Sequence, residues 1–310
     1  MHGYSGAARV LCSTVGMSRE DWLQARRRGI GSSDGAAVLG LDDWRTALAV
    51  ALEKWGRAPE QQPSQLLRWG TAMEPLVADW FTEDTGKRLQ RRRAILQHPD
   101  ADHVIADLDR VVAGEWVPLE IKTTSAWNAD DWADGDVPRR VVVQLQHQLA
   151  VTGAPYGYWA VLIGGNDPRW GRLDRDDDLI SEMLLRYQHF WTHFVEAGVE
   201  PPPSAPSDWS LMRRRYPAEE PGKTLALDSR GREALLDLLA ASRKAKAAAA
   251  AVETAKARVA ALLGDAEAGT LPGSDLPVVT YRTVPRKEYT VPASASRQLV
   301  VKERVLNGGQ

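Results

Sequence analysis

The feature that most constrains this sequence is a pair of extended, largely apolar runs joined by a short turn. HVIADLDRVV occupies residues 103–112 and WVPLEIKTT occupies residues 116–124. β-Branched residues are frequent in both runs, and the connection Ala113-Gly114-Glu115 contains the glycine typical of a turn. We therefore predict two strands of one β-hairpin at this place.

Helical and extended patterns surround this hairpin in a regular order. Upstream, apolar residues at helical spacing predict a helix that ends at Gly86 and has Pro75 as a first-turn residue or a kink. The other predicted elements are a strand over 88–96, a helix over 141–151, a strand over 156–163, helices over 21–28, 34–39 and 46–55, and an amphipathic segment over 177–197. The central order is α-β-β-β-α-β, which predicts an α+β fold.

Composition excludes several classes of protein. With 310 residues and 44% hydrophobic content the chain can bury a sizeable core, yet no apolar run approaches the roughly 20 residues that cross a bilayer. The first residues lack the pattern of a secretory signal, so we expect a cytoplasmic protein that does not enter a membrane. Cys12 is the single cysteine, which excludes an iron–sulfur cluster and leaves oxygen or histidine ligands for any metal.

Charge gives a weaker indication. The formal net charge is −2, but arginines are clustered at 26–28, 91–93, 139–140 and 213–215. Each cluster is either a solvated face or a local patch for a polyanion. Gly222-Lys223-Thr224 ends like a phosphate loop, but Pro217 stands in the position of the leading glycine, so we expect no use of ATP.

Composition also changes along the chain and predicts its division. We expect a flexible leader over 1–17, a main domain over 18–203 and a linker over 204–226 that includes the proline-rich PPPSAPS. Beyond it, 227–310 is expected to be an appendage of one long Ala-, Leu- and Lys-rich helix and a small β segment.

The predicted hairpin carries the most informative polar residues. Glu120 and Lys122 are two apart on a strand and share a face, and Asp109 can lie near Glu120 across the hairpin. Two carboxylates and the backbone carbonyl of Ile121 form an oxygen donor set suited to Mg²⁺ or Mn²⁺, and Lys122 could orient a water or offset charge. This combination is typical of phosphodiester hydrolysis. Spacing alone does not distinguish Asp109 from Asp107, and a surface salt bridge would have the same pattern.

With a helix containing Glu74 before it and a helix containing Gln144 after it, this hairpin resembles the core of the PD-(D/E)XK nucleases. Six blocks extend the resemblance to the YqaJ-type viral recombinases, which are related to lambda exonuclease. The blocks are W-x3-R at Trp22 and Arg26, GIGSSDGAAVLG at 29–40, WGTAMEP at 69–75, DLDRVV at 107–112, LEIKTT at 119–124 and QLQHQLAVTG at 144–153.

The resemblance implies a mixed central β-sheet flanked by helices, and a 5′→3′ exonuclease that acts on double-stranded DNA ends and leaves 3′ overhangs for a single-strand annealing recombinase. It implies a trimeric ring and divalent metal, with Mg²⁺ replaceable by Mn²⁺. By carry-over, Asp109 and Glu120 would bind metal, Lys122 would assist the attacking water and Gln144 would orient water or substrate. Glu74 would support a metal or its waters, and it could instead be an exposed first-turn acid.

Arg26 and Ser33 match the positions that hold a 5′ phosphate in this family, and a serine at a helix start beside an arginine suits an anion. An ordinary helix cap with a surface arginine is the alternative. Two other functions remain open at this point. One is an endonuclease on the same core, and the other is a non-catalytic DNA-end-binding adaptor.

Overall fold

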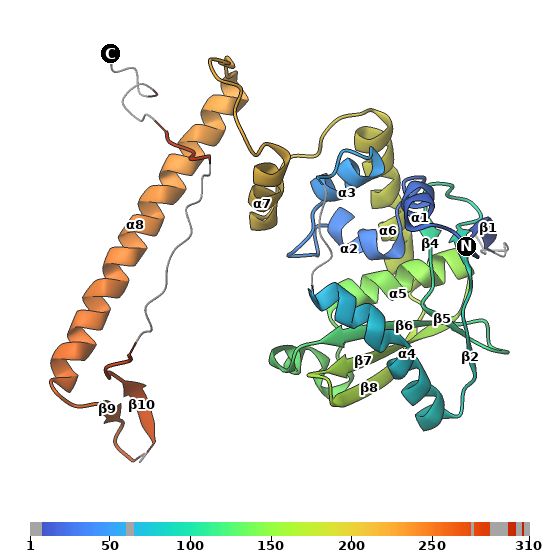
Figure 1. The fold of residues 1–310 in the computed structure, drawn as a ribbon, viewed down its shortest axis with the longest axis horizontal. Helices are drawn as coiled ribbons and strands as arrows, with labels where there is room; N and C mark the ends of the chain where they lie inside the picture. The colour runs from blue at the N-terminus through green and yellow to red at the C-terminus, as the bar shows by residue number, and fades with distance from the viewer. Residues whose placement is uncertain (1–7, 60–64, 274–275, 286–296, 302–305, 307–310) are drawn as a thin grey trace. The chain divides into compact units, whose positions relative to one another are not determined.

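The computed structural model describes residues 8–59, 65–273, 276–285, 297–301 and 306. The chain divides into two compact units, Met1–Arg215 and Tyr216–Gln310 (Figure 1). None of the helices in the described part of the chain is long and apolar enough to span a bilayer.

The first unit is built on a five-stranded mixed sheet in the order β2-β5-β6-β7-β8. β6 and β7 are parallel, and the other neighbouring pairs are antiparallel. The strands are β2 (Leu89–Gln90), β5 (Arg110–Val112), β6 (Pro118–Thr124), β7 (Tyr156–Ile163) and β8 (Asp167–Asp174). The predicted hairpin is therefore present as β5–β6, with Arg110 opposite Leu119.

Helices pack on both faces of this sheet because successive residues of a strand point to opposite sides. Leu119 and Ile121 of β6 belong to one apolar cluster with Phe81 of α4 (Gln65–Thr85), which contains Pro75. Trp159 of β7 is in another cluster with Leu145 of α5 (Arg139–Thr152). Glu120 and Lys122 thus lie on the face that α5 covers.

A smaller sheet and the remaining helices complete the unit. The small sheet has the order β1-β3-β4, from β1 (Arg9–Ser13), β3 (Ala94–Gln97) and β4 (Ile105–Ala106). The further helices are α1 (Arg19–Arg26), α2 (Gly35–Val38), α3 (Ala47–Lys54), α6 (Asp177–Phe190) with a π-helical continuation over Trp191–Glu196, and α7 (Pro206–Arg215). Short 3-10 turns cover Ser32–Asp34, Ala126–Asn128 and Asp130–Gly135.

Several sequence predictions are wrong in detail. The run 103–112 is not one strand, because β4 pairs with β3 in the small sheet and β5 pairs with β6 in the large one. The run 88–96 is divided in the same way between β2 and β3. β8 was not predicted at all, because its sequence DPRWGRLD lacks the apolar residues of a buried strand and it is an edge strand with partly exposed side chains.

The expected leader and linker also contain ordered elements. Within 1–17, β1 pairs with β3, and residues 1–7 lie outside the described residues. Within 204–226, α7 packs on α3, because Leu211 is buried against Leu48 and Leu52 and the Thr46 hydroxyl donates to Asp208 Oδ1 at 2.6 Å. The division between the units therefore falls after Arg215.

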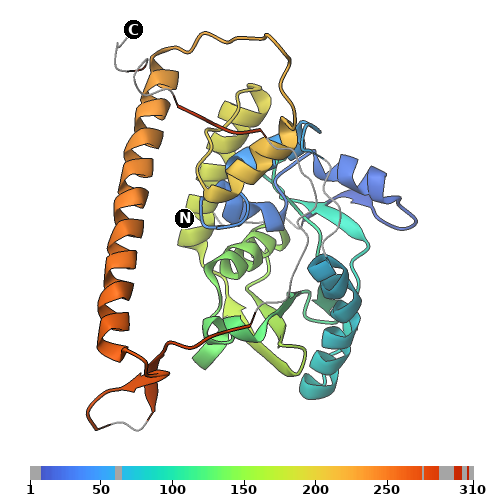
Figure 2. The same ribbon diagram turned by 60° about the vertical axis from the view of Figure 1, so that its left-hand side comes forward.

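The second unit has one long helix, α8 (Ser229–Leu263), which is straight over its whole length (Figure 2). The Asp228 side chain caps it by accepting from Gly231 N at 3.0 Å. None of its described side chains is buried, and β9 (Ala268–Thr270) and β10 (Pro277–Thr280) form a small antiparallel hairpin after it.

Candidate active site

The β5–β6 register brings Asp109 next to Glu120. Since β5 and β6 are antiparallel and Arg110 is opposite Leu119, Asp109, which immediately precedes β5, comes beside Glu120 of β6. The backbone N–H of Ile121 donates to Asp109 Oδ2 at 2.8 Å, which fixes the orientation of this carboxylate. Glu120 is almost fully buried. The two carboxylates predicted from the sequence thus meet at one place.

Lys122 and Gln144 complete a closed triangle of polar contacts with Glu120. Lys122 Nζ lies 2.6 Å from Glu120 Oε1 and donates to Gln144 Oε1 at 2.9 Å. Gln144 Nε2 donates to the same Glu120 Oε1 at 2.7 Å. The triangle joins β6 to α5 and orients the ammonium group between a carboxylate and an amide.

Gln148, which sequence reasoning did not single out, also contacts this site. It lies one helical turn beyond Gln144 on α5, and its Nε2 donates to Glu120 Oε2 at 2.5 Å. Both oxygens of Glu120 are therefore hydrogen-bonded. The i, i+4 spacing of the two glutamines was the sequence signal that could have identified it.

The electrostatics of this cluster favour an added cation. Burial and the neighbouring Glu120 carboxylate raise the pKa of Asp109 well above its usual range. Burial opposes the charge of Lys122, but Glu120 and Asp109 outweigh it and raise the pKa of this lysine. The buried carboxyl group of Glu120 and the half-buried one of Asp109 share a single ammonium group, and a divalent cation would favour their ionised forms, so the donor chemistry fits a metal such as Mg²⁺.

Glu74 lines a cavity together with Asp109, Glu120 and Lys122, but its carboxylate is already paired with arginine. Arg110 Nη1 approaches Glu74 Oε1 to 2.5 Å, and Arg91 Nη2 lies 3.8 Å from the same oxygen. Among the residues that the structure describes, no three His, Cys, Asp or Glu side chains converge in a metal-binding group. The fit for direct metal ligation therefore rests on Asp109 and Glu120, because Glu74 is paired with Arg110 and Arg91.

The structure separates the two aspartates that spacing could not. Asp107 Oδ2 accepts from Trp22 Nε1 at 2.8 Å, and burial raises the pKa of this carboxyl group. Asp109 instead contacts the backbone beside Glu120. Asp109 is thus the aspartate of the carboxylate pair, and Asp107 connects the strand to α1.

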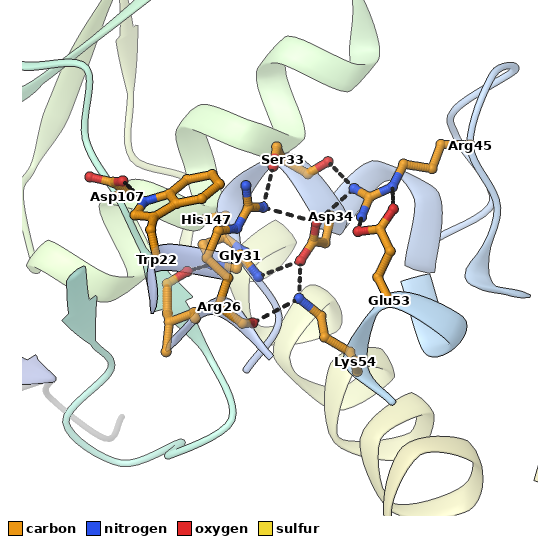
Figure 3. A network of polar contacts seen from close by, with 11 residues as sticks. Trp22, Arg26, Gly31, Ser33, Asp34, Arg45, Glu53, Lys54, Asp107 and His147 are labelled. Atoms are coloured by element: carbon orange, nitrogen blue, oxygen red, sulfur yellow. Dashed lines mark hydrogen bonds and ion pairs between the residues drawn. The ribbon is translucent and has the colours of Figure 1, made fainter. Parts of the chain in front are cut away.

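Arg26 and Ser33 come together as predicted. Arg26, at the end of α1, donates through Nη2 to Ser33 Oγ at 2.8 Å, and its guanidinium lies 4.8 Å from the centre of the Trp22 ring (Figure 3). Ser33 belongs to the 3-10 turn Ser32–Asp34. A guanidinium and a hydroxyl at this spacing can both donate to one phosphate.

Both groups of residues line one cavity of about 840 Å³. Its lining includes Trp22, Arg26, Ser33, Glu74, Arg91, Arg92, Arg93, Asp107, Asp109, Glu120, Ile121, Lys122 and Gln144. Every site residue predicted from the sequence is in this set. The arginine cluster 91–93 is also there, so positive charge gathers beside the carboxylates.

Comparison with known proteins identifies the family. Residues 21–155 match the model of the YqaJ-like viral recombinase domain. The protein YqaJ of Bacillus subtilis strain 168 is 38% identical over 241 residues, which cover 76% of this chain and 75% of that protein. The chain belongs to the YqaJ-like viral recombinase family.

Solved structures show the fold of this YqaJ-like protein. The alkaline exonuclease LHK-Exo from Laribacter hongkongensis superposes with a TM-score of 0.51 and 22% identity, over 58% of this chain and 94% of that one. The same enzyme in complex with dAMP gives 0.51 and 23%, with the same coverage. The central mixed sheet with its flanking helices is therefore the PD-(D/E)XK core expected from the sequence.

Proposed function

We propose that this protein is a metal-dependent 5′→3′ exonuclease that hydrolyses double-stranded DNA from its ends during phage-type recombination and leaves 3′ single-stranded overhangs. One observation carries the proposal. The carboxylate pair with Lys122 and the Arg26–Ser33 pair line the same cavity. An enzyme that binds a terminal phosphate beside the hydrolytic centre acts on ends, whereas an endonuclease has no need of such a site.

The residues that would hold the metal are Asp109, Glu120 and the carbonyl of Ile121, with Glu74 reaching it through water. A bound Mg²⁺, or Mn²⁺ in its place, would supply an activated water and neutralise phosphate charge. In the mechanism we propose, Lys122 donates hydrogen bonds to the attacking water and to the developing negative charge on phosphate. Gln144 holds Lys122 and Glu120 in register through the contacts at 2.9 and 2.7 Å.

Arginines on the cavity wall support the proposal that the substrate is a polyanion such as DNA. Arg91, Arg92 and Arg93 lie on the segment between β2 and β3 and line the cavity next to Glu74. They would contact backbone phosphates of the bound duplex, which explains how a chain of nearly neutral net charge binds DNA. LHK-Exo, which shares the fold, was solved with dAMP, a mononucleotide of the kind that this reaction would release.

The partners follow from family resemblance and belong to the same proposal. They are the ends of double-stranded DNA, a single-strand annealing recombinase that takes up the overhang, and two further copies of this chain in a trimeric ring. The proposed place of action is the cytoplasm of the bacterial host, and neither ATP nor an iron–sulfur cluster takes part.

The decisive experiment digests a linear duplex labelled separately at its 5′ and 3′ ends, with Mg²⁺ or EDTA, and a covalently closed circle beside it. We expect release of the 5′ label as mononucleotide only with metal, and an intact circle. Lys122→Ala should abolish hydrolysis and retain DNA binding, while Lys223→Ala, at an exposed lysine of the second unit, should match the wild type. A cut circle would indicate an endonuclease, and an intact linear duplex would indicate an adaptor.

A further inference from the structure

A buried carboxylate that no sequence argument identified lies behind the Arg26–Ser33 pair. Asp34 is fully buried, and its Oδ2 accepts from Lys54 Nζ at 2.6 Å and from the backbone N–H of Gly31 at 2.8 Å. Its Oδ1 lies 2.6 Å from Arg45 Nη1 and 3.2 Å from Arg26 Nη2 (Figure 3). One carboxylate thus contacts three cationic side chains.

The partners of Asp34 keep it ionised. Burial by itself would raise the pKa of Asp34, but Lys54, Arg45 and Arg26 outweigh it and hold the pKa well below its usual range. Glu53 pairs with Arg45 on the outer side of the cluster. With two carboxylates and three cations, the group carries one net positive charge, and the half-buried Arg26 is its member that lines the cavity.

The guanidinium of Arg26 is fixed by contacts with a ring, a hydroxyl and a carboxylate. Its guanidinium packs over Trp22, while its Nη2 is shared between Ser33 Oγ and Asp34 Oδ1. Its backbone carbonyl accepts from Lys54 Nζ at 3.1 Å, so the lysine that neutralises Asp34 also fixes the end of α1. An arginine that is immobilised before its ligand arrives loses less conformational freedom on binding than a free surface arginine.

We propose that Asp34 is the positioning residue for recognition of a 5′-phosphomonoester. Asp34 orients the guanidinium of Arg26 toward the cavity beside Ser33. The positive charges of Lys54 and Arg45 offset the negative charge of Asp34, so that this carboxylate can lie next to an anion-binding site. A carboxylate there would otherwise repel the phosphate. The inference rests on the proposed function, because it assumes that the Arg26–Ser33 pair binds the DNA end.

The test measures binding, so that it does not depend on hydrolysis. Fluorescence anisotropy in EDTA gives the Kd for one duplex with a 5′-phosphate end and for the same duplex with a 5′-hydroxyl end. The ratio of the two Kd values is the phosphate preference. We expect Asp34→Asn to reduce this preference at least tenfold while the Kd for the hydroxyl end stays within twofold of the wild type. Glu53→Gln removes a charge from the outer side of the same cluster, where Glu53 pairs with Arg45, and it should keep the wild-type preference.

A second variant covers the case in which Asp34→Asn fails to fold because it leaves the buried Lys54 and the half-buried Arg45 with too little negative charge. Asp34→Asn combined with Lys54→Met removes one charge of each sign, and it should also lose the preference while binding the hydroxyl end. A folded variant that keeps the wild-type preference would overturn the positioning role. A wild type without any preference would instead refute the phosphate site itself, and a wild type that prefers phosphate but cleaves no DNA would refute only the proposed nuclease.

Discussion

Acid should weaken this fold through one buried histidine. His147 of α5 is fully buried, and its Nε2 lies 2.8 Å from the carbonyl oxygen of Ile105. Because a carbonyl only accepts, Nε2 carries the proton, and Nδ1 faces the Tyr187 hydroxyl at 3.4 Å. Burial lowers the pKa of His147 from 6.5 to about 4. Between about pH 4 and pH 6.5 this histidine is therefore neutral in the folded protein and protonated in the unfolded chain.

The sign and size of the effect follow from linkage. Since the folded pKa is the lower one, the unfolded chain binds more protons below pH 6.5, and stability falls as the pH decreases toward 4. The full shift corresponds to about 3 kcal/mol, of which about 2 kcal/mol is lost between pH 7.5 and pH 5. α5 also carries Gln144 and Gln148, so acid acts on the helix that holds Glu120 in place.

Urea unfolding of the wild type and of His147→Gln at pH 7.5, 6 and 5 measures this contribution. Glutamine can donate to the Ile105 carbonyl but does not titrate in this range. Burial also lowers the pKa of His98 and His103, so both proteins should lose some stability in acid. The difference between their slopes isolates His147. Equal slopes for the two proteins would refute the assignment of a neutral, buried imidazole.

Three further changes test the packing and the site. Gly35→Ala would place a Cβ 2.2 Å from the Tyr187 hydroxyl oxygen and should lower the free energy of unfolding by about 2 kcal/mol. Adding Tyr187→Phe to this variant should recover part of the loss. If the effects of the two substitutions were fully additive, the contact between the two residues would be contradicted. Leu211→Ala should lower stability by about 2–3 kcal/mol in thermal unfolding, and an unchanged Tm would mean that α7 does not pack on α3. Gln148→Ala removes a hydrogen bond to Glu120 and should lower kcat about tenfold with KM unchanged; wild-type kinetics would show that Glu120 needs no such support.

The sequence by itself determined which polar residues gather at the candidate site and much of the local structure. Alternation along β6 placed Glu120 and Lys122 on one face and Ile121 on the other, because strand geometry leaves no other choice. Arg26 and Ser33 are only seven residues apart, and the turn between their segments brings them into contact. Helical periodicity likewise located α5 to within two residues at its start and one at its end.

Tertiary structure alone decided how the strands are distributed and which residues support the site. The run 103–112 is apolar along most of its length because both of its strands are buried, so its pattern does not mark where the chain leaves one sheet for the other. Asp107 and Asp109 lie at this crossing, and only their partners, Trp22 and the Ile121 N–H, distinguish them. The partners of Asp34 were also decided by tertiary structure, since Lys54 lies twenty residues away and contacts Asp34 only because α3 packs beside the 3-10 turn. A buried carboxylate stays ionised only when cations surround it, and packing of distant chain segments brings those cations together.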